Sequence, residues 1–228
     1  MNVLDELAIK YGTDKSSRYH GFTAPYFQTF DAERDSVKKV LEVGVFFGSS
    51  INMWRDYFSN AVIYGLDRFD GKQGNGRSFP DADKFFVQHQ LHPDPRVKLF
   101  KVDQADEKQL QNFVASMKPK EAFDIIIDDG SHLMRDQQLT IGWLFPLLKK
   151  GGYYVIEDLH SSNASDYDVL PDGSNSTLKL LQNFMVKGTV SSTYLSGELN
   201  EQLSKTIESI FLAYTNNNSS ITGIIRKK

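Results

Sequence analysis

The sequence predicts an α/β protein whose sheet is doubly wound, mostly parallel and covered by helices on both faces. Three observations predict it. From Lys38 onward, short apolar runs alternate with stretches of helical length in five successive repeats. The apolar runs show no strong period-two alternation, which is typical of strands buried on both faces. Near the end, two apolar runs flank Asn216–Ser220 and indicate a C-terminal antiparallel hairpin.

The individual elements follow from these runs and from the residues between them. The expected parallel strands are Val40–Val43, Ala61–Leu66, Val97–Val102, Phe123–Ile127 and Tyr153–Ile156. The expected helices are Ser50–Phe58, Asp81–Gln90, Glu107–Met117 and Gln137–Leu148, the last stopped by Gly151 and Gly152. The hairpin strands are Ser209–Tyr214 and Ile221–Ile225, and the glycine-rich Asp70–Pro80 is expected to be a mobile loop.

Two short helices are expected before the first strong strand. Val3–Tyr11 has helical apolar spacing and ends at Gly12, a favourable C-cap, and a second helix is expected at Pro25–Glu33. We therefore predict that residues 1–36 form a helical extension over a binding cleft and that residues 37–228 form the main domain.

Composition excludes several classes of function. The chain has 228 residues, a net charge of -3 and no cysteine. The charge argues against a nucleic-acid partner held by bulk electrostatics, and the missing cysteines exclude disulfides and thiolate chemistry. The sequence shows neither a signal peptide nor a membrane-spanning apolar run, so we expect a cytoplasmic protein. The sequence is also compatible with a homo-oligomer.

A glycine turn after the first strand indicates a nucleoside ligand. Gly44 suits a tight turn and Gly48 suits close packing at the helix start beside Ser49, whereas Phe46 replaces the middle glycine of G-x-G-x-x-G. That glycine lets the backbone approach a pyrophosphate, so its absence suits S-adenosylmethionine (SAM) better than NAD. Asp67, about 20 residues onward, is expected at the ribose, and Asp103 with Gln104 is expected near the adenine.

Acidic residues gather where the fourth and fifth strands end. Asp128 and Asp129 precede His132, and Glu157 is followed by Asp158. Singly, each acid reads as a cap or loop residue, and a lone loop histidine is usually a surface residue. Together, Asp129, Glu157 and Asp158 offer the oxygen ligands that Mg²⁺ prefers, and His132 is a candidate general base.

One geometric condition applies to this cluster. Neighbouring strand residues point to opposite faces, so Glu157 and Asp158 can share an ion only if the chain turns there. The other histidines are not assigned to the chemistry. His20, His89 and His92 are expected to be structural, and His160 is expected either to line the site or to cap a loop.

Four segments resemble a known enzyme family. They are YGTDKSSRYHGFTAPYFQTF, LEVGVFFGSS, IDDGSH and GGYYVIEDLH, and the resemblance covers roughly Tyr11 to Asp158. They resemble metal-dependent class I SAM-dependent O-methyltransferases that act on sugars, of the macrolide (mycinamicin and tylosin) type and from bacterial polysaccharide clusters. The resemblance implies a Rossmann-like fold. It also implies an acceptor, a small molecule or a glycan, with neighbouring hydroxyl groups.

The resemblance assigns roles to individual residues. It implies Mg²⁺ on Asp129, Glu157 and Asp158, with His132 as the base. The G-T-D-K segment would close the cofactor site near the methionine end of SAM, although a helix C-cap followed by a turn also explains it. Leu159–Asn175 is expected to form part of the acceptor pocket. The complete set expected at the cofactor is Tyr11, Thr13, Lys15, Glu42, Gly44, Gly48, Ser49, Asp67, Asp103, Gln104 and Asp128.

Other functions stay open. A metal-dependent catechol O-methyltransferase uses the same chemistry, but such enzymes usually carry Asp-Asn where this chain has Glu157-Asp158. A nicotinamide-dependent oxidoreductase is the alternative from another class, and the missing middle glycine argues against it. A non-catalytic binding protein is disfavoured by the intact acids and His132. Base methylation of nucleic acid is disfavoured because no N-P-P-Y-type motif is present.

Overall fold

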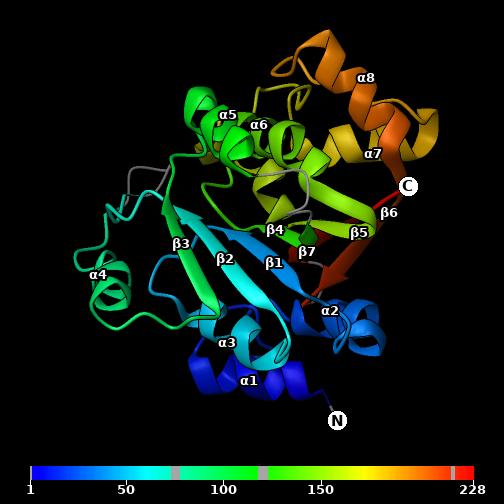
Figure 1. Cartoon of the computed structure of the whole chain (residues 1–228). Helices are drawn as coiled ribbons and strands as arrows, with labels where there is room; N and C mark the ends of the chain where they lie inside the picture. The colour runs from blue at the N-terminus through cyan, green and yellow to red at the C-terminus, as the bar shows by residue number, and fades with distance from the viewer. Residues whose placement is uncertain (1, 73–77, 118–122, 217–218) are drawn as a thin grey trace.

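The protein is built around one seven-stranded sheet (Figure 1). The computed structural model describes residues 2–72, 78–117, 123–216 and 219–228. The strands lie in the order β3-β2-β1-β4-β5-β7-β6, with the first five parallel and the last two antiparallel. This confirms the predicted fold class. The strands are β1 (Lys39–Val43), β2 (Val62–Asp67), β3 (Val97–Lys101), β4 (Phe123–Asp128), β5 (Leu148–Ile156), β6 (Ile207–Thr215) and β7 (Ser220–Lys227).

Helices cover both faces of the sheet, each over its own apolar core (Figure 1). Alternation along β1 divides the cores, since Val40 packs on one side and Leu41 on the other. The face on the side of Val40 is covered by three helices: α1 (Val3–Tyr11), α2 (Thr23–Phe30) and α3 (Ser49–Tyr57). The face on the side of Leu41 is covered by four: α5 (Glu107–Ser116), α6 (Met134–Leu144), α7 (Thr177–Lys187) and α8 (Gly197–Thr206). The remaining helix, α4 (Lys84–Leu91), lies beyond the β3 edge.

The two N-terminal helices belong to the core of one face. Leu4 and Ala8 of α1 are fully buried, and so is Tyr26 of α2. Asn2 caps the start of α1 by accepting the Asp5 amide, and Gly12 ends the helix in the left-handed conformation. Both predicted N-terminal helices are confirmed, with the second continuing as a 3-10 turn at Asp31–Glu33.

The predicted end of the fourth main-domain helix is wrong. The helix was expected over Gln137–Leu148, but α6 ends at Leu144 and a 3-10 turn, Phe145–Leu147, leads directly into β5. Gly151 and Gly152 therefore lie inside β5 instead of stopping a helix. At Gly152 a Cβ would lie 2.8 Å from the Asp124 carbonyl oxygen, so close backbone approach explains the glycine.

The last third of the chain adds elements that are not predicted from the sequence. After β5 come two 3-10 turns, Leu159–Asn163 and Ser165–Tyr167, and then α7 and α8. The predicted C-terminal hairpin is confirmed as β6 and β7. Of the loop predicted at Asp70–Pro80, residues 73–77 lie outside the described part. No helix of the described residues is long and apolar enough to cross a membrane.

Candidate functional site

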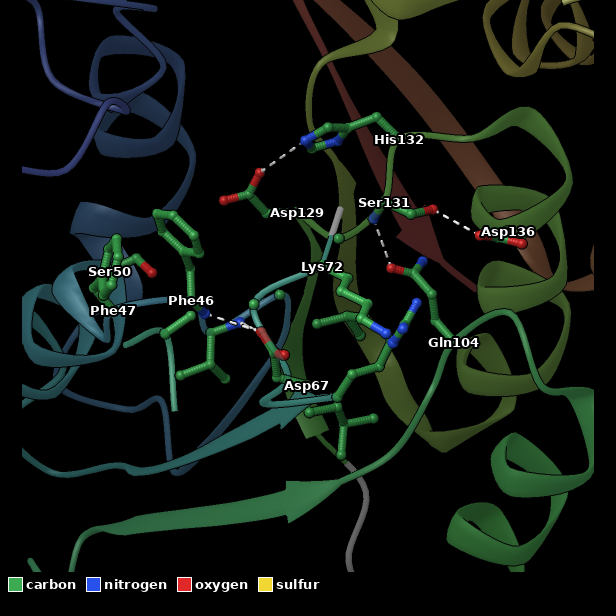
Figure 2. Close-up of a pocket in the computed structure, with 18 of the residues that line it drawn as sticks. Phe46, Phe47, Ser50, Asp67, Lys72, Gln104, Asp129, Ser131, His132 and Asp136 are labelled. Carbon is green, nitrogen blue, oxygen red and sulfur yellow. Dashed lines mark hydrogen bonds and ion pairs between the residues drawn. The ribbon is translucent and has the colours of Figure 1, made fainter. Parts of the chain in front are cut away.

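A cleft of about 760 Å³ opens at the carboxyl ends of the parallel strands (Figure 2). Its wall comes from the turn after β1, the ends of β2 and β3, the loop after β4, and the segment after α1. This is the edge at which doubly wound sheets bind their ligands. The sequence-predicted residues that line it are Thr13, Lys15, Gly44, Ser49, Asp67, Asp103, Gln104, Asp129 and His132.

The glycine turn is held in place by two neighbours. Gly44 has φ +90°, and a Cβ there would lie 1.9 Å from the carbonyl oxygen of Asp129. Asp67 accepts the backbone N–H groups of Val45 at 2.8 Å and Phe46 at 2.9 Å (Figure 2). Its other oxygen accepts the Phe69 amide at 2.7 Å. Asp67 therefore fixes the turn, and a carboxylate keeps further lone pairs for a ligand hydroxyl.

Gln104 clamps the loop after β4. Its Oε1 accepts the Ser131 amide at 2.7 Å (Figure 2). Its Nε2 donates to Thr140 Oγ1 at 3.1 Å. A Cβ on Gly130 would lie 1.7 Å from Gln104 Oε1, so a larger residue there would push the Gln104 amide out of its present position. Both ends of the amide are thus engaged within the protein. The structure places Gln104 at the cleft wall with its polar groups turned toward the loop that carries Asp129 and His132.

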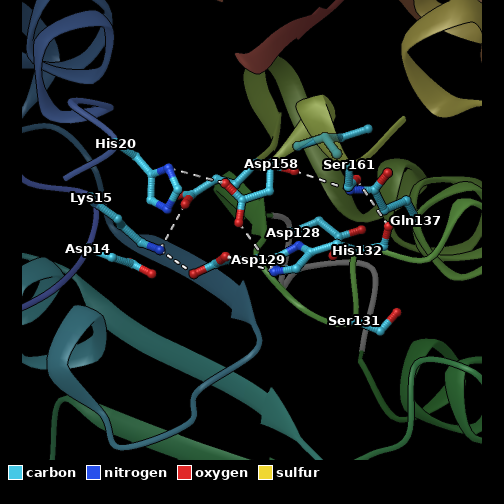
Figure 3. Close-up of polar contacts among 12 residues, drawn as sticks. Asp14, Lys15, His20, Asp128, Asp129, Ser131, His132, Gln137, Asp158 and Ser161 are labelled. Carbon is cyan, nitrogen blue, oxygen red and sulfur yellow. Dashed lines mark hydrogen bonds and ion pairs between the residues drawn. The ribbon is translucent and has the colours of Figure 1, made fainter. Parts of the chain in front are cut away.

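Two left-handed residues bring the acids and the histidine together (Figure 3). His132 has φ 60° and Asp158 has φ 54°. His132 Nε2 lies 3.3 Å from Asp158 Oδ2 and 3.9 Å from Asp129 Oδ1. Because β5 ends at Ile156 and Asp158 turns the chain, Asp158 faces the same space as Asp129. The chain therefore turns where the prediction requires it, but Glu157 is not in the group of Asp129, His132 and Asp158 whose atoms lie within 4.8 Å of one another.

Lys15 joins the acids from the N-terminal segment. Its ammonium group hydrogen-bonds Asp129 Oδ2 (Figure 3). It also donates to Glu157 Oε2 at 2.9 Å and lies 3.7 Å from Glu42 Oε1. The side chain is 1% exposed. Burial lowers the pKa of Lys15, but the three carboxylates around it hold that pKa well above its ordinary value. The lysine is therefore a permanent cation inside the cluster.

Burial dominates the electrostatics of the acids. It raises the pKa of Asp128 to about 8 and that of Glu42 to about 7, the latter against the opposing effect of Lys15. It also raises the pKa of Glu157 well above the usual range. Such shifts mark groups that desolvation penalises, and they occur where acids gather around a functional site.

Several predicted site residues stand outside the cleft wall. Tyr11 donates a hydrogen bond to Asp56 of α3, on the far side of the N-terminal segment. Glu42 is fully buried and accepts bonds from Ser50 and Trp54. The others that do not line the cleft are Gly48, which begins α3 with φ +78°, Asp128, Glu157 and Asp158.

Sequence reasoning missed one histidine, His20, and left the role of His160 open. His20 Nδ1 and His160 Nδ1 lie 3.9 Å and 3.8 Å from Asp158 Oδ1, opposite the oxygen that faces His132. His20, expected to be structural, is held there by Ser220 Oγ at 2.8 Å. The only signal was its place in the segment that resembles the methyltransferases, because 138 residues separate it from Asp158.

The donor set fits a divalent cation. Atoms of Asp129, His132 and Asp158 lie within 4.8 Å of one another. Asp158 Oδ1 and Glu157 Oε1 are buried and have no hydrogen-bond partner among the described residues. Unpartnered buried carboxylate oxygens require compensation, and hard oxygen donors suit Mg²⁺. Glu157 is turned toward Lys15, so its second oxygen is the one left for an ion.

Comparison with known proteins agrees with this geometry. Residues 41–159 match the family described as "Methyltransferase domain". L-olivosyl-oleandolide 3-O-methyltransferase of Streptomyces antibioticus is 30% identical over 84% of this chain and 46% of its own length. Mycinamicin VI 2''-O-methyltransferase of Micromonospora griseorubida is 34% identical over 68% of this chain and 36% of its own length.

A solved structure is similar over nearly the whole chain. It is the MycE methyltransferase from the mycinamycin biosynthetic pathway in complex with Mg, SAH and mycinamycin VI. The TM-score is 0.72 at 25% identity, covering 98% of this chain and 54% of that one. This chain thus spans about half the length, or less, of the relatives it matches.

Proposed function

The chain belongs to the methyltransferase-domain family, and on this premise we propose that it transfers a methyl group from SAM to a hydroxyl group of a sugar. The observation that carries the proposal is the convergence of Asp129, His132 and Asp158 beside the cleft. A base and two carboxylates at the carboxyl end of the sheet are what a metal-assisted transfer to a hydroxyl requires. The relatives that methylate sugars of macrolides and tetracenomycins support this acceptor class.

The cofactor would lie along the cleft wall. We propose that the turn at Gly44 and Ser49 carries the adenosine, that Asp67 receives the ribose hydroxyls, and that Asp103 lies near the adenine, since all of them line the cleft. Phe46 and Phe47, 37% and 44% exposed, add apolar surface on the same side. Residues 1–36 would form the wall over this site, because Thr13 and Lys15 reach the cleft from that segment.

The chain's own groups define the chemistry. The transfer forms an O–CH₃ bond, breaks an S–CH₃ bond and releases the hydroxyl proton. His132 Nε2 is the group placed to accept that proton, since it faces the space between Asp129 and Asp158. Those carboxylates, with Glu157, would hold Mg²⁺, which when bound lowers the pKa of a chelated hydroxyl group. The left-handed turn at His132 fixes the imidazole, so the catalysis comes largely from positioning.

Binding of S-adenosylhomocysteine (SAH) tests the cofactor assignment first. We expect calorimetry to show SAH binding, with NAD as the control ligand showing none. Transfer of a labelled methyl group should then be measured on sugars with neighbouring hydroxyl groups, with Mg²⁺ and with EDTA. Binding of NAD instead of SAH, or of neither ligand, would contradict the proposal.

Two variants test the roles at the reacting end. His132→Ala should lower the rate of methyl transfer by roughly 10²- to 10⁴-fold, the usual contribution of a general base, while SAH affinity stays close to that of the wild type. Asp129→Ala should abolish Mg²⁺-dependent turnover with the same small effect on SAH. His92→Ala, at an exposed position beyond α4, is the matched control. Equal loss of SAH affinity and turnover would argue against both roles.

A further inference from the structure

We propose that Lys15 is an internal cation that positions Asp129 and Glu157 for a divalent ion, and that it does not bind the cofactor. The inference rests on the proposed function, because it concerns the same acid cluster. It replaces the role that the sequence suggested for Lys15, which was contact with the methionine end of SAM.

The position of Lys15 is fixed by its surroundings. Its carbonyl oxygen accepts the Thr23 amide at 3.1 Å. Asp5 of α1 accepts the Ser17 amide at 2.7 Å and the Thr23 hydroxyl at 2.7 Å. The segment that follows Lys15 is thus fastened to α1, and the Lys15 side chain itself is buried.

Both hydrogen bonds of the Lys15 ammonium group go to the protein's own acids. An ammonium group has three N–H donors. Two of them serve Asp129 Oδ2 and Glu157 Oε2, and the Nζ also lies 3.7 Å from Glu42 Oε1. The side chain is 1% exposed, although Lys15 lines the inner wall of the cleft. A cofactor carboxylate would have to displace a buried ion pair to reach it, which is costly.

Lys15 uses one oxygen of each carboxylate and leaves the other. Asp129 Oδ1 faces His132 Nε2 at 3.9 Å, and Glu157 Oε1 is buried without a hydrogen-bond partner among the described residues. Because each carboxylate is held by one oxygen, its second oxygen has a fixed direction. This is how outer partners commonly orient the ligands of a metal.

The charges of the cluster leave room for an ion. Lys15 pairs with Glu42, Asp129 and Glu157. Asp158 has no ion pair with Lys15 among the described residues and shares its space with Asp129 and His132, so a divalent ion on that side would complement the lysine. We expect both to be present together, each on its own set of oxygens.

The test measures metal and SAH binding separately in the full chain. Mn²⁺ binding is followed by the loss of the free-ion signal in electron paramagnetic resonance, and SAH binding by calorimetry in EDTA. In Lys15→Met we expect the Kd for Mn²⁺ to rise by at least about tenfold, the usual effect of losing an orienting partner. The Kd for SAH should stay within about twofold, less than 0.5 kcal/mol. Lys205→Met, which removes an exposed lysine from an ion pair on α8, should change neither.

A second variant covers the case in which Lys15→Met fails to fold. Lys15→Arg keeps the charge but replaces a point donor with a planar fork, so it should also weaken Mn²⁺ binding while SAH binding is retained. The proposal is overturned if SAH binding falls and Mn²⁺ binding does not, which would make Lys15 a cofactor ligand. It is also overturned if Mn²⁺ binds Lys15→Met more tightly, which would mean that Lys15 only occupies the ion's place. Failure of the wild type to bind SAH would count against the proposed function instead, and the Mn²⁺ comparison would still decide the role of Lys15.

Discussion

Asp158 shows how one residue organises the site. Its φ of 54° is a conformation that costs a residue other than glycine about 1–3 kcal/mol. That turn places one carboxylate oxygen at His132 and the other near His20 and His160. Strain at this position is therefore compensated by contacts from segments that are far apart in the chain.

Gln104 supports a prediction that separates positioning from binding. Gln104→Ala removes the acceptor of the Ser131 amide and loosens the loop that carries His132. We expect the rate of methyl transfer to fall by roughly 10- to 100-fold, because small displacements of reacting groups are costly, while SAH affinity changes little. Rates and SAH titrations should be compared with Gln202→Ala, an exposed position on α8. A loss of SAH affinity as large as the loss of rate would instead indicate an adenine contact.

Glu42 supports a prediction about stability and pH. Burial raises the pKa of Glu42 to about 7 in the folded chain. At pH values between the pKa of Glu42 in the unfolded chain and about 7, the folded chain therefore keeps a proton that the unfolded chain has lost. The carboxyl group then lowers the free energy of unfolding as pH rises, and the effect levels off above about pH 7. Denaturation by urea should show a steeper fall of stability with pH in the wild type than in Glu42→Gln, in which the other buried acids, such as Asp128, still contribute. Parallel pH profiles of the two proteins would contradict it.

At the scale of elements, the turn between β1 and α3 supports a comparison of two glycines. Gly44→Ala combines a positive φ with a clash against the Asp129 carbonyl, so we expect a loss of roughly 2–5 kcal/mol in the free energy of unfolding. Gly188→Ala has φ +69° but open space around it, so about 1–2 kcal/mol is expected there. Chemical denaturation measures both. Equal losses would show that the contact with Asp129 is unimportant.

The sequence predicted the parallel strands well for a physical reason. A strand buried on both faces is a short continuous apolar run, and β2 and β4 each show one that ends in an aspartate. The end of α6 was mispredicted because Gly151 and Gly152 resemble a helix stop, whereas close contact with a neighbouring strand requires Gly152. Local patterns do not distinguish these two uses of glycine.

The sequence predicts which residues form the candidate site but not which of them form ion pairs with one another. The acids and His132 stand at strand ends, where the topology brings them together. The partner of Asp129 and Glu157 was not predictable, since Lys15 lies 114 and 142 residues away from them. An ion pair between residues so far apart in the chain produces no local sequence pattern. The G-T-D-K motif is therefore the only sequence feature from which a role for Lys15 can be predicted.

On the scale of the whole molecule, the N-terminal helices should unfold together with the sheet. Leu4 is fully buried in the core shared with β1, so Leu4→Ala should cost about 2–5 kcal/mol. Calorimetry should show one transition at a lower temperature. Leu91→Ala, at a side chain that is 70% exposed, should change stability by less than about 0.5 kcal/mol. A separate early transition would mean that residues 1–36 fold independently of residues 37–228.

The burial of Lys15 has a consequence for chimeras made between this chain and its relatives. The segment shared with the family, residues 41–159, carries Glu42, Asp129 and Glu157, but the cation between them comes from outside it. A chimera made by grafting that segment alone would inherit three crowded carboxylates and depend on the host for their counter-charge. A chimera that folds and functions should therefore have its crossover before α1, so that Lys15 and the three acids come from the same parent protein.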